Sequence, residues 1–160
     1  MSVFSKAIIA STTAIVLGFS GAVIAESHVD PMIAGAIKAR QAHMQLYAHN
    51  LGVLGAMAQD KMAYDAAAAT AAANNLAALI TLDQMSYWPA GSAAGEVDGS
   101  RALPAIWTDF PGVMEKAGAL GAAVTAMQAA AGTDLDSLKG AMGALGGACG
   151  GCHQAYRQSN

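Results

Sequence analysis

Three side chains near the C-terminus have the types and spacing needed to hold an iron porphyrin. Cys149, Cys152 and His153 form a C-x-x-C-H motif, which is the attachment signature of c-type haem. Residues three apart share one face of a helix, so both thiols can reach the two vinyl groups on one porphyrin edge. His153 lies one turn beyond Cys149, where its imidazole can supply the proximal iron ligand. The motif therefore predicts one covalently bound haem c.

Two other kinds of site use paired cysteines. A disulfide or thioredoxin-like redox pair is expected in a βαβ setting, and no strand-like alternation surrounds these cysteines. A structural zinc ion takes four ligands, whereas the motif supplies three and the sequence has no second C-x-x-C. Haem attachment is the interpretation that explains both cysteines, as thioether donors, and the histidine, as an iron ligand.

Residues 1–25 have the pattern of a cleavable signal peptide. Lys6 provides a positive charge, residues 7–25 are apolar and rich in small side chains, and residues 23–25 fit a cleavage site before Glu26. A retained membrane anchor is the alternative, but several Ser, Thr and Gly residues make the stretch weakly hydrophobic. We therefore expect a periplasmic protein with no membrane segment after cleavage, in which residues 26–160 form one domain.

Composition narrows the range of functions. The formal net charge is −3 and no basic stripe is present, which argues against a nucleic-acid partner. Aromatic residues are only 6% of the chain, so Ala, Leu and Met carry the apolar content, and a bulky flat cofactor would add buried apolar area. The carboxylates are scattered over expected helix caps and exposed faces, so we expect no enzymatic acid–base site.

The apolar spacing predicts an all-α fold, a four-helix antiparallel bundle that encloses the covalently bound haem. The first helix begins at Asp30-Pro31, and the second runs from Asp65 to about Tyr87. A Gly/Ser-rich crossover loop follows at residues 90–101. The inward seam of the first helix has four-three spacing and consists of Ile33, Ile37, Arg40, Met44, Tyr47, Leu51 and Leu54.

The second half of the chain predicts two further long helices. Pro104 opens a short turn, and Thr108 or Asp109 caps the third long helix, which ends near Gly132. Thr133 is the expected cap of the last helix. The inward seam of that helix consists of Leu135, Leu138, Met142, Leu145, Cys149, Cys152 and Tyr156. Because the seam runs into the C-x-x-C-H motif, the thiols should face the bundle interior.

Arg40 and Met44 are the next most informative residues. A guanidinium on an apolar seam is costly unless it is paired, and Met44 follows one turn later. If this face covers the haem, Met44 can reach the iron and Arg40 the propionates. Core packing for Met44 and a snorkelling side chain for Arg40 are the alternatives. His43 and His49 are rival ligands that lie off the seam, so we expect both to face solvent or a helix boundary.

Residues 31–160 resemble the class II cytochromes c, the group of the cytochromes c′ and the low-spin cytochromes c-556, which are four-helix bundles with haem near the C-terminus. The C-terminal motif is the specific part of this resemblance, and the other matches are short but occur in the expected order. The matching segments are Arg40-Gln41 with Met44, residues 53–58, residues 64–66, Ile106-Trp107, and residues 149–153 followed by Tyr156-Arg157.

The resemblance implies roles that spacing leaves open. In this family the position held by Met44 lies on the distal face of the haem. Cytochromes c′ usually carry a non-ligating residue there and have five-coordinate iron, whereas in the c-556 group a Met ligates the iron. The similarity of residues 53–66 to the latter group implies six-coordinate iron held by His153 and Met44. Arg40 and Gln41 match positions near the propionates.

Two functions of different class follow from the resemblance. The first is a periplasmic electron carrier that exchanges one electron with redox partner proteins. The second is a five-coordinate haem protein that binds NO or CO. Some relatives form dimers through their first two helices, so a homodimer is a further partner that the resemblance allows.

Overall fold

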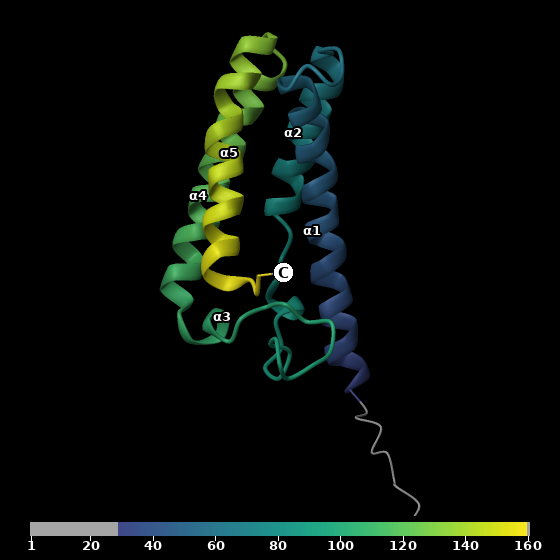
Figure 1. Ribbon diagram of the computed structural model, residues 1–160, viewed down its shortest axis with the longest axis vertical. Coiled ribbons are helices and arrows are strands. Elements are labelled where there is room, and N and C mark those ends of the chain that lie inside the picture. The colour runs from purple at the N-terminus through teal and green to yellow at the C-terminus, as the bar shows by residue number, and fades with distance from the viewer. Residues whose placement is uncertain (1–28, 160) are drawn as a thin grey trace, which may run out of the picture.

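The computed structural model describes residues 29–159, and in this part of the chain all regular structure is helical. The signal peptide and its cleavage site fall outside these residues, so both stay predictions. Four long helices run antiparallel and form a bundle (Figure 1), which confirms the predicted fold class. The elements are α1 (Pro31–Ala58), α2 (Ala66–Ile80), the 3-10 turn η1 (Met85–Tyr87), α3 (Ala105–Thr108), α4 (Phe110–Ala131) and α5 (Leu135–Tyr156).

An aspartate precedes each long helix and accepts hydrogen bonds from its first turn, as expected for an N-cap. The caps of α1, α2, α4 and α5 are Asp30, Asp65, Asp109 and Asp134. The prediction that Thr133 caps the last helix is wrong. The Thr133 hydroxyl instead donates to the Ala129 carbonyl at 3.2 Å, and the Asp134 carboxylate accepts from the Ser137 amide at 2.7 Å.

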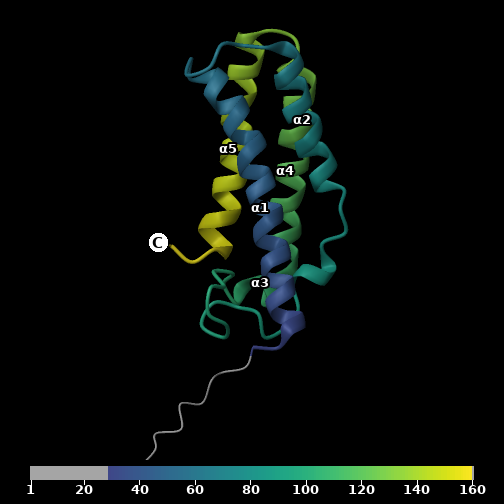
Figure 2. The same ribbon diagram turned by 90° about the vertical axis from the view of Figure 1, so that its right-hand side faces the viewer.

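The second helix ends earlier than predicted, at Ile80 rather than Tyr87. The Thr81 hydroxyl donates to the Ala78 carbonyl at 2.7 Å, and Asp83 accepts from the Met85 amide at 2.9 Å. Such local side-chain bonds compete with helix continuation and start the separate turn η1. The chain that follows α2 therefore folds under one end of the bundle instead of extending the helix (Figures 1 and 2).

The apolar core fills the half of the bundle that lies away from the C-x-x-C-H motif. Small residues of α2, such as Ala69 and Ala73, are fully buried there and let the helices approach closely. Along α5 the buried residues are Leu138, Leu145 and Tyr156, so none lies between Leu145 and the end of the helix. The largest fully buried side chains are those of Leu54, Met57, Val124, Met127, Leu138 and Leu145.

The helices of the same residues were compared with the requirements for a membrane-spanning segment. Within residues 29–159, no helix combines the length and the apolar character needed to cross a bilayer.

The fold predicts unequal costs for two leucine truncations. Leu138 is 0% exposed and Leu46 is 52% exposed. Leu138→Ala should lower the free energy of unfolding by about 2–5 kcal/mol, because it removes buried methyl groups and leaves a cavity. Leu46→Ala is the control and should change stability by less than about 0.5 kcal/mol. Urea denaturation followed by circular dichroism measures both, and equal losses would contradict the described core.

Candidate functional site

The predicted attachment residues all lie on the last two turns of α5. The thiols of Cys149 and Cys152 are half-buried and form no disulfide. Burial raises the pKa of both thiols. A redox-active C-x-x-C pair works through a lowered thiol pKa, so this environment does not suit thiol–disulfide exchange. It does suit two cysteines that form stable thioether bonds.

His153 sits in surroundings that keep its imidazole neutral. Burial lowers the pKa of His153, and the positive charges of Arg157 and Arg101 lower it further. An imidazole must be unprotonated at the coordinating nitrogen to bind a metal ion. The three residues of the motif are therefore prepared to hold haem c.

Contacts between α1 and α5 fix how these antiparallel helices lie against each other (Figure 1). Near one end, the Lys139 ammonium pairs with Asp60 at 3.0 Å. Further along, the Met142 methyl lies 3.6 Å from the position that a Cβ would take on Gly55. Nearer the motif, burial raises the pKa of Tyr47 to about 12, and the proximity of Cys149 contributes to the rise.

This register sets Met44 level with His153. Met44 is eleven residues before Gly55 on α1, and His153 is eleven residues after Met142 on α5. Eleven residues make about three helical turns and about 16 Å. Each of the two residues is therefore on nearly the same face of its helix as Gly55 or Met142. On ideal helix geometry this spacing puts both residues about 20° from the line of that contact, and a facing position for Met44 and His153 stays a prediction. The prediction that Met44 lies on the inward apolar seam is wrong, because Met44 is 41% exposed while the neighbouring His43 is buried.

His43 corrects the sequence analysis, because it is buried rather than facing solvent. It is 4% exposed, and its ring packs on Tyr47 at 4.7 Å and on Tyr87 at 5.9 Å between centroids. Both α5 and the segment after α2 cover α1, so its buried stripe is wider than the predicted seam. His49 is exposed, as expected. The Nε2 atom of His43 has no hydrogen-bond partner among the described residues.

Arg40 is 5% exposed, so it is not a snorkelling side chain. One guanidinium nitrogen donates to the Tyr87 carbonyl at 3.2 Å and to the Ser92 hydroxyl at 2.8 Å. The other donates to the Ser92 carbonyl at 2.6 Å and to the Ser100 hydroxyl at 2.8 Å. The guanidinium carbon also lies 4.9 Å from the centre of the Trp88 ring. Arg40 thus ties α1 to the segment that follows η1.

The charge of Arg40 is not balanced within the described part of the chain. The salt bridges found there are Lys116–Glu115 and Lys139–Asp60, and neither involves Arg40. Burial lowers the pKa of the guanidinium, which reflects the cost of enclosing this charge. The region around Arg40 therefore suits an anionic group. Pairing of Arg40 with a haem propionate stays a prediction that this surplus charge supports.

Gln41 is exposed and has a different set of contacts. Its side-chain amide donates to the Gly99 carbonyl at 2.9 Å. Gly99 has a φ of 81°, which favours glycine and fits the predicted Asp98-Gly99 turn. The structure therefore places Gln41 against the loop, and its role near the propionates stays a prediction.

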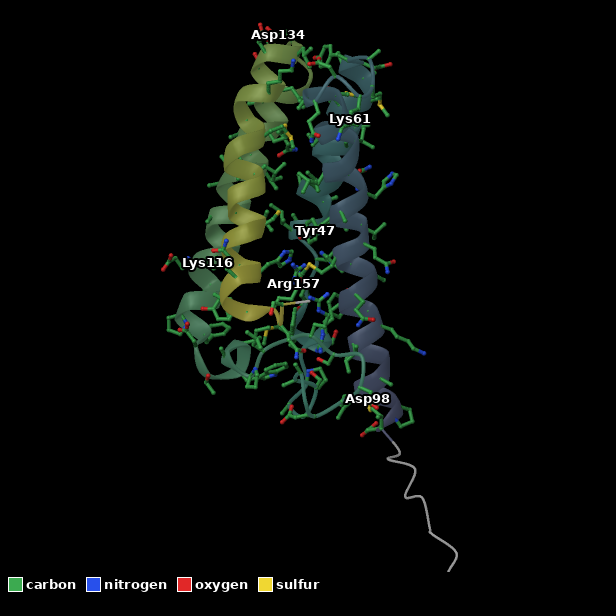
Figure 3. All side chains as sticks on the ribbon, viewed as in Figure 1. Tyr47, Lys61, Asp98, Lys116, Asp134 and Arg157 are labelled. Carbon is green, nitrogen blue, oxygen red and sulfur yellow. The ribbon has the colours of Figure 1, made fainter. Side chains whose placement is uncertain are left out.

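Sequence reasoning missed the partners of Arg40 and the position of His43. Ser92 and Ser100 lie in a Gly/Ser-rich loop, and local composition carries no signal that they would meet a residue of α1. Tyr47 was placed on the seam but was not expected to lie beside Cys149. Figure 3 shows Tyr47 and Arg157 at the level of the motif, away from Asp134 and Lys61 at the other end of the bundle.

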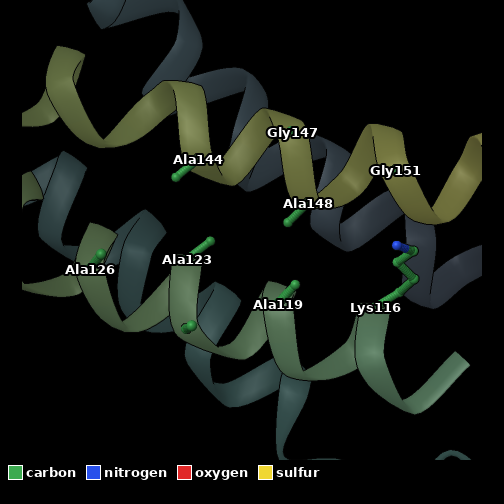
Figure 4. A pocket seen from close by; sticks show the side chains of 9 residues that line it. Lys116, Ala119, Ala123, Ala126, Ala144, Gly147, Ala148 and Gly151 are labelled. Atoms are coloured by element: carbon green, nitrogen blue, oxygen red, sulfur yellow. The ribbon is translucent and has the colours of Figure 1, made fainter. Parts of the chain in front are cut away.

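A shallow apolar groove runs between α4 and α5 (Figure 4), and it is separate from the site. Neither thiol, nor His153 or Met44, lines it. The groove results from the small side chains of the two helices. Its lining residues are Lys116, Ala119, Ala122, Ala123, Ala126, Ala144, Gly147, Ala148 and Gly151.

Residues 29–159 contain no cluster of side chains that could coordinate a metal ion directly. No group of three or more His, Cys, Asp or Glu side chains is placed there to hold one. The zinc alternative therefore gains no support from the described residues.

Known proteins resemble this chain over most of its length. Residues 35–157 match the family described as cytochrome C′. A cytochrome c-554 of Cereibacter sphaeroides is 49% identical over 78% of this chain and 81% of its own. A solved cytochrome c′ from Rhodobacter sphaeroides is 37% identical with a TM-score of 0.79, covering 82% and 100% of the two chains. A ferrous cytochrome c′ variant from Alcaligenes xylosoxidans with bound NO is 30% identical with a TM-score of 0.70, covering 82% and 100%.

The contacts of Arg40 predict how its replacement affects the loop. Arg40→Leu should speed amide hydrogen exchange in residues 90–101 and lower stability by at least about 2 kcal/mol, because buried acceptors lose their donors. Arg40→Lys should recover part of both losses, since it keeps the charge without the planar fork. Lys38→Leu, at an exposed position of the same helix, is the control. A wild-type rate of amide hydrogen exchange in Arg40→Leu would show that Arg40 does not hold the loop in place.

Proposed function

Because this chain belongs to the cytochrome c′ family, whose members carry one covalent haem c, we propose that it is a periplasmic electron carrier with iron bound by His153 and Met44. The register between α1 and α5 is the observation that supports this proposal, since Met44 and His153 are each eleven residues from the Gly55 and Met142 level. The haem supplies a one-electron couple of ferric and ferrous iron.

The residues of α5 fit the attachment of the cofactor. Cys149 and Cys152 hold the porphyrin through thioether bonds, and His153 presents a neutral nitrogen to the iron. All three belong to one continuous helix, so their spacing is fixed by the backbone. A rigid helix limits movement of the proximal ligand when the iron changes charge.

Met44 supplies the distal ligand in this proposal. It extends from α1, which the Lys139–Asp60 pair joins to α5. A thioether ligand favours ferrous iron, and a His/Met pair raises the reduction potential. Both ligands come from long packed helices, which suits a carrier that must keep six-coordinate iron in both oxidation states.

Arg40 balances a propionate charge in the same arrangement. Its guanidinium is already fixed by the Tyr87, Ser92 and Ser100 contacts, so it needs little further ordering to meet a carboxylate. Gln41 lies beside it and anchors the adjacent loop. Both residues thus act as supports for the cofactor and not as ligands of the iron.

The other parts of the proposal follow from this assignment. A carrier of this kind catalyses no reaction of its own and exchanges electrons with redox partner proteins. Export to the periplasm follows from the signal pattern of residues 1–25 and from the need to attach haem c outside the cytoplasm. Assembly as a homodimer remains compatible with all of these statements.

Gas binding is the second candidate function. The ferrous Alcaligenes xylosoxidans cytochrome c′ variant is a fold neighbour with bound NO. The 41% exposure of Met44 also favours this candidate, because an unpacked distal side chain can move aside for a diatomic ligand. The two candidates differ in one measurable property, which is the coordination number of the iron.

The attachment chemistry predicts the outcome of solvent extraction. Acid–acetone treatment should leave the haem on the wild-type protein, because two thioether bonds hold it. The Cys149→Ala/Cys152→Ala double variant, in which any haem is held only by ligation, should release it. The haem absorbance of the two phases measures both results. Haem that leaves the wild-type protein would contradict covalent attachment.

The distal ligand predicts the spin state of the iron. If Met44 ligates, the wild-type protein should be low-spin in both oxidation states and should bind CO slowly, because the thioether must first leave. Met44→Ala should give five-coordinate, high-spin ferrous iron that binds CO at least about tenfold faster, once the ligand barrier of about 1.4 kcal/mol or more is removed.

Met32→Ala is the matched control, since Met32 is exposed on the same helix. It should keep the wild-type absorption spectrum and rate of CO binding. A wild-type protein that is already high-spin, with a spectrum unchanged in Met44→Ala, would favour gas binding over electron transfer.

A further inference from the structure

His43 carries the one fully buried side-chain polar atom without a partner in residues 29–159. A buried imidazole nitrogen that lacks a hydrogen bond is costly, so an isolated one needs an explanation. An imidazole can carry its hydrogen on Nε2, which makes that atom a hydrogen-bond donor. An acceptor beside Nε2 would remove the cost.

His43 and Arg40 face the same region of the molecule. They are three residues apart on α1, so they share one side of the helix. Both contact Tyr87: Arg40 donates to its carbonyl at 3.2 Å, and the ring of His43 packs against its ring. The two groups therefore lie in one compartment between α1 and residues 87–100.

The neighbouring hydroxyl groups are already engaged. The Ser92 hydroxyl accepts from Arg40 and donates to the Pro89 carbonyl at 2.7 Å. The Ser100 hydroxyl accepts from Arg40 and donates to the Ser92 carbonyl at 2.7 Å. Arg40 has no carboxylate partner among the described residues, and His43 has no acceptor there. The two terminal nitrogens of Arg40 already donate four hydrogen bonds, so its Nε–H group and its unbalanced charge remain for a partner. A single carboxylate between the two residues would accept from His43 and balance this charge.

We infer that the Nε2–H group of His43 donates a hydrogen bond to a haem carboxylate that also pairs with Arg40. This inference rests on the proposed function, because the haem supplies the carboxylate. It gives His43 a role in positioning the cofactor that is distinct from iron ligation. Adjacent helix residues point about 100° apart, so with Met44 toward α5 the ring of His43 points toward Tyr87.

The expected effect on the iron follows from charge. A hydrogen bond to a carboxylate withdraws negative charge from the haem edge, which disfavours ferric iron. Without this bond the ferric state gains stability and the reduction potential falls. We expect the ratio of oxidised to reduced protein at a fixed potential to rise roughly threefold, because only part of a charge-assisted bond differs between the two states.

The test compares three variants of the haem-loaded protein by resonance Raman spectroscopy and potentiometry. His43→Phe removes the donor and should shift the propionate bending mode to lower frequency, with the threefold change in redox ratio. His43→Gln keeps an N–H donor and should stay close to the wild type in both measurements. His49→Phe is the control at an exposed histidine of the same helix and should change neither.

The outcomes separate this inference from the proposed function. An unchanged propionate mode and potential in His43→Phe would overturn the inference, and so would equal shifts in the Phe and Gln variants, which would indicate packing alone. A change from low-spin to high-spin iron in His43→Phe would also overturn it, since His43 would then be an iron ligand. A wild-type protein with high-spin iron would refute Met44 ligation, yet the expected propionate shift would still support His43.

Discussion

The register of α1 against α5 is the constraint on which the arrangement of the site depends. Met142 lies beside Gly55 at one level, and the Lys139–Asp60 pair holds the same register nearer the helix ends. Because both helices are long and continuous, this register extends to the C-x-x-C-H motif without further contacts.

A second constraint is the polar end of the bundle. Arg40 donates hydrogen bonds to Tyr87, Ser92 and Ser100 and so fixes an irregular segment against α1. The same segment covers His43, which is buried. The site therefore combines a helix that carries the attachment residues with a loop that is held by a single cation, and the two parts meet on α1.

Much of this arrangement could be predicted from the sequence, because the signals were local. The C-x-x-C-H motif and the aspartate caps act within one helical turn, and they predicted the bundle, the cofactor and most helix starts. The end of α2 and the burial of His43 could not be predicted in this way. The end of α2 depends on competing bonds of Thr81 and Asp83, and the burial of His43 depends on a loop more than forty residues away.

The unequal distribution of apolar residues along the bundle has a consequence for the order of assembly. One half, built around Leu54, Met127 and Leu138, holds the apolar core, which needs no cofactor to be filled. The other half encloses the charge of Arg40 and the unpartnered Nε2 atom of His43, so it has less to stabilise it before the cofactor is bound. Such a division would keep the thiols of α5 accessible to a haem-attachment apparatus while the rest of the chain is already protected from proteolysis.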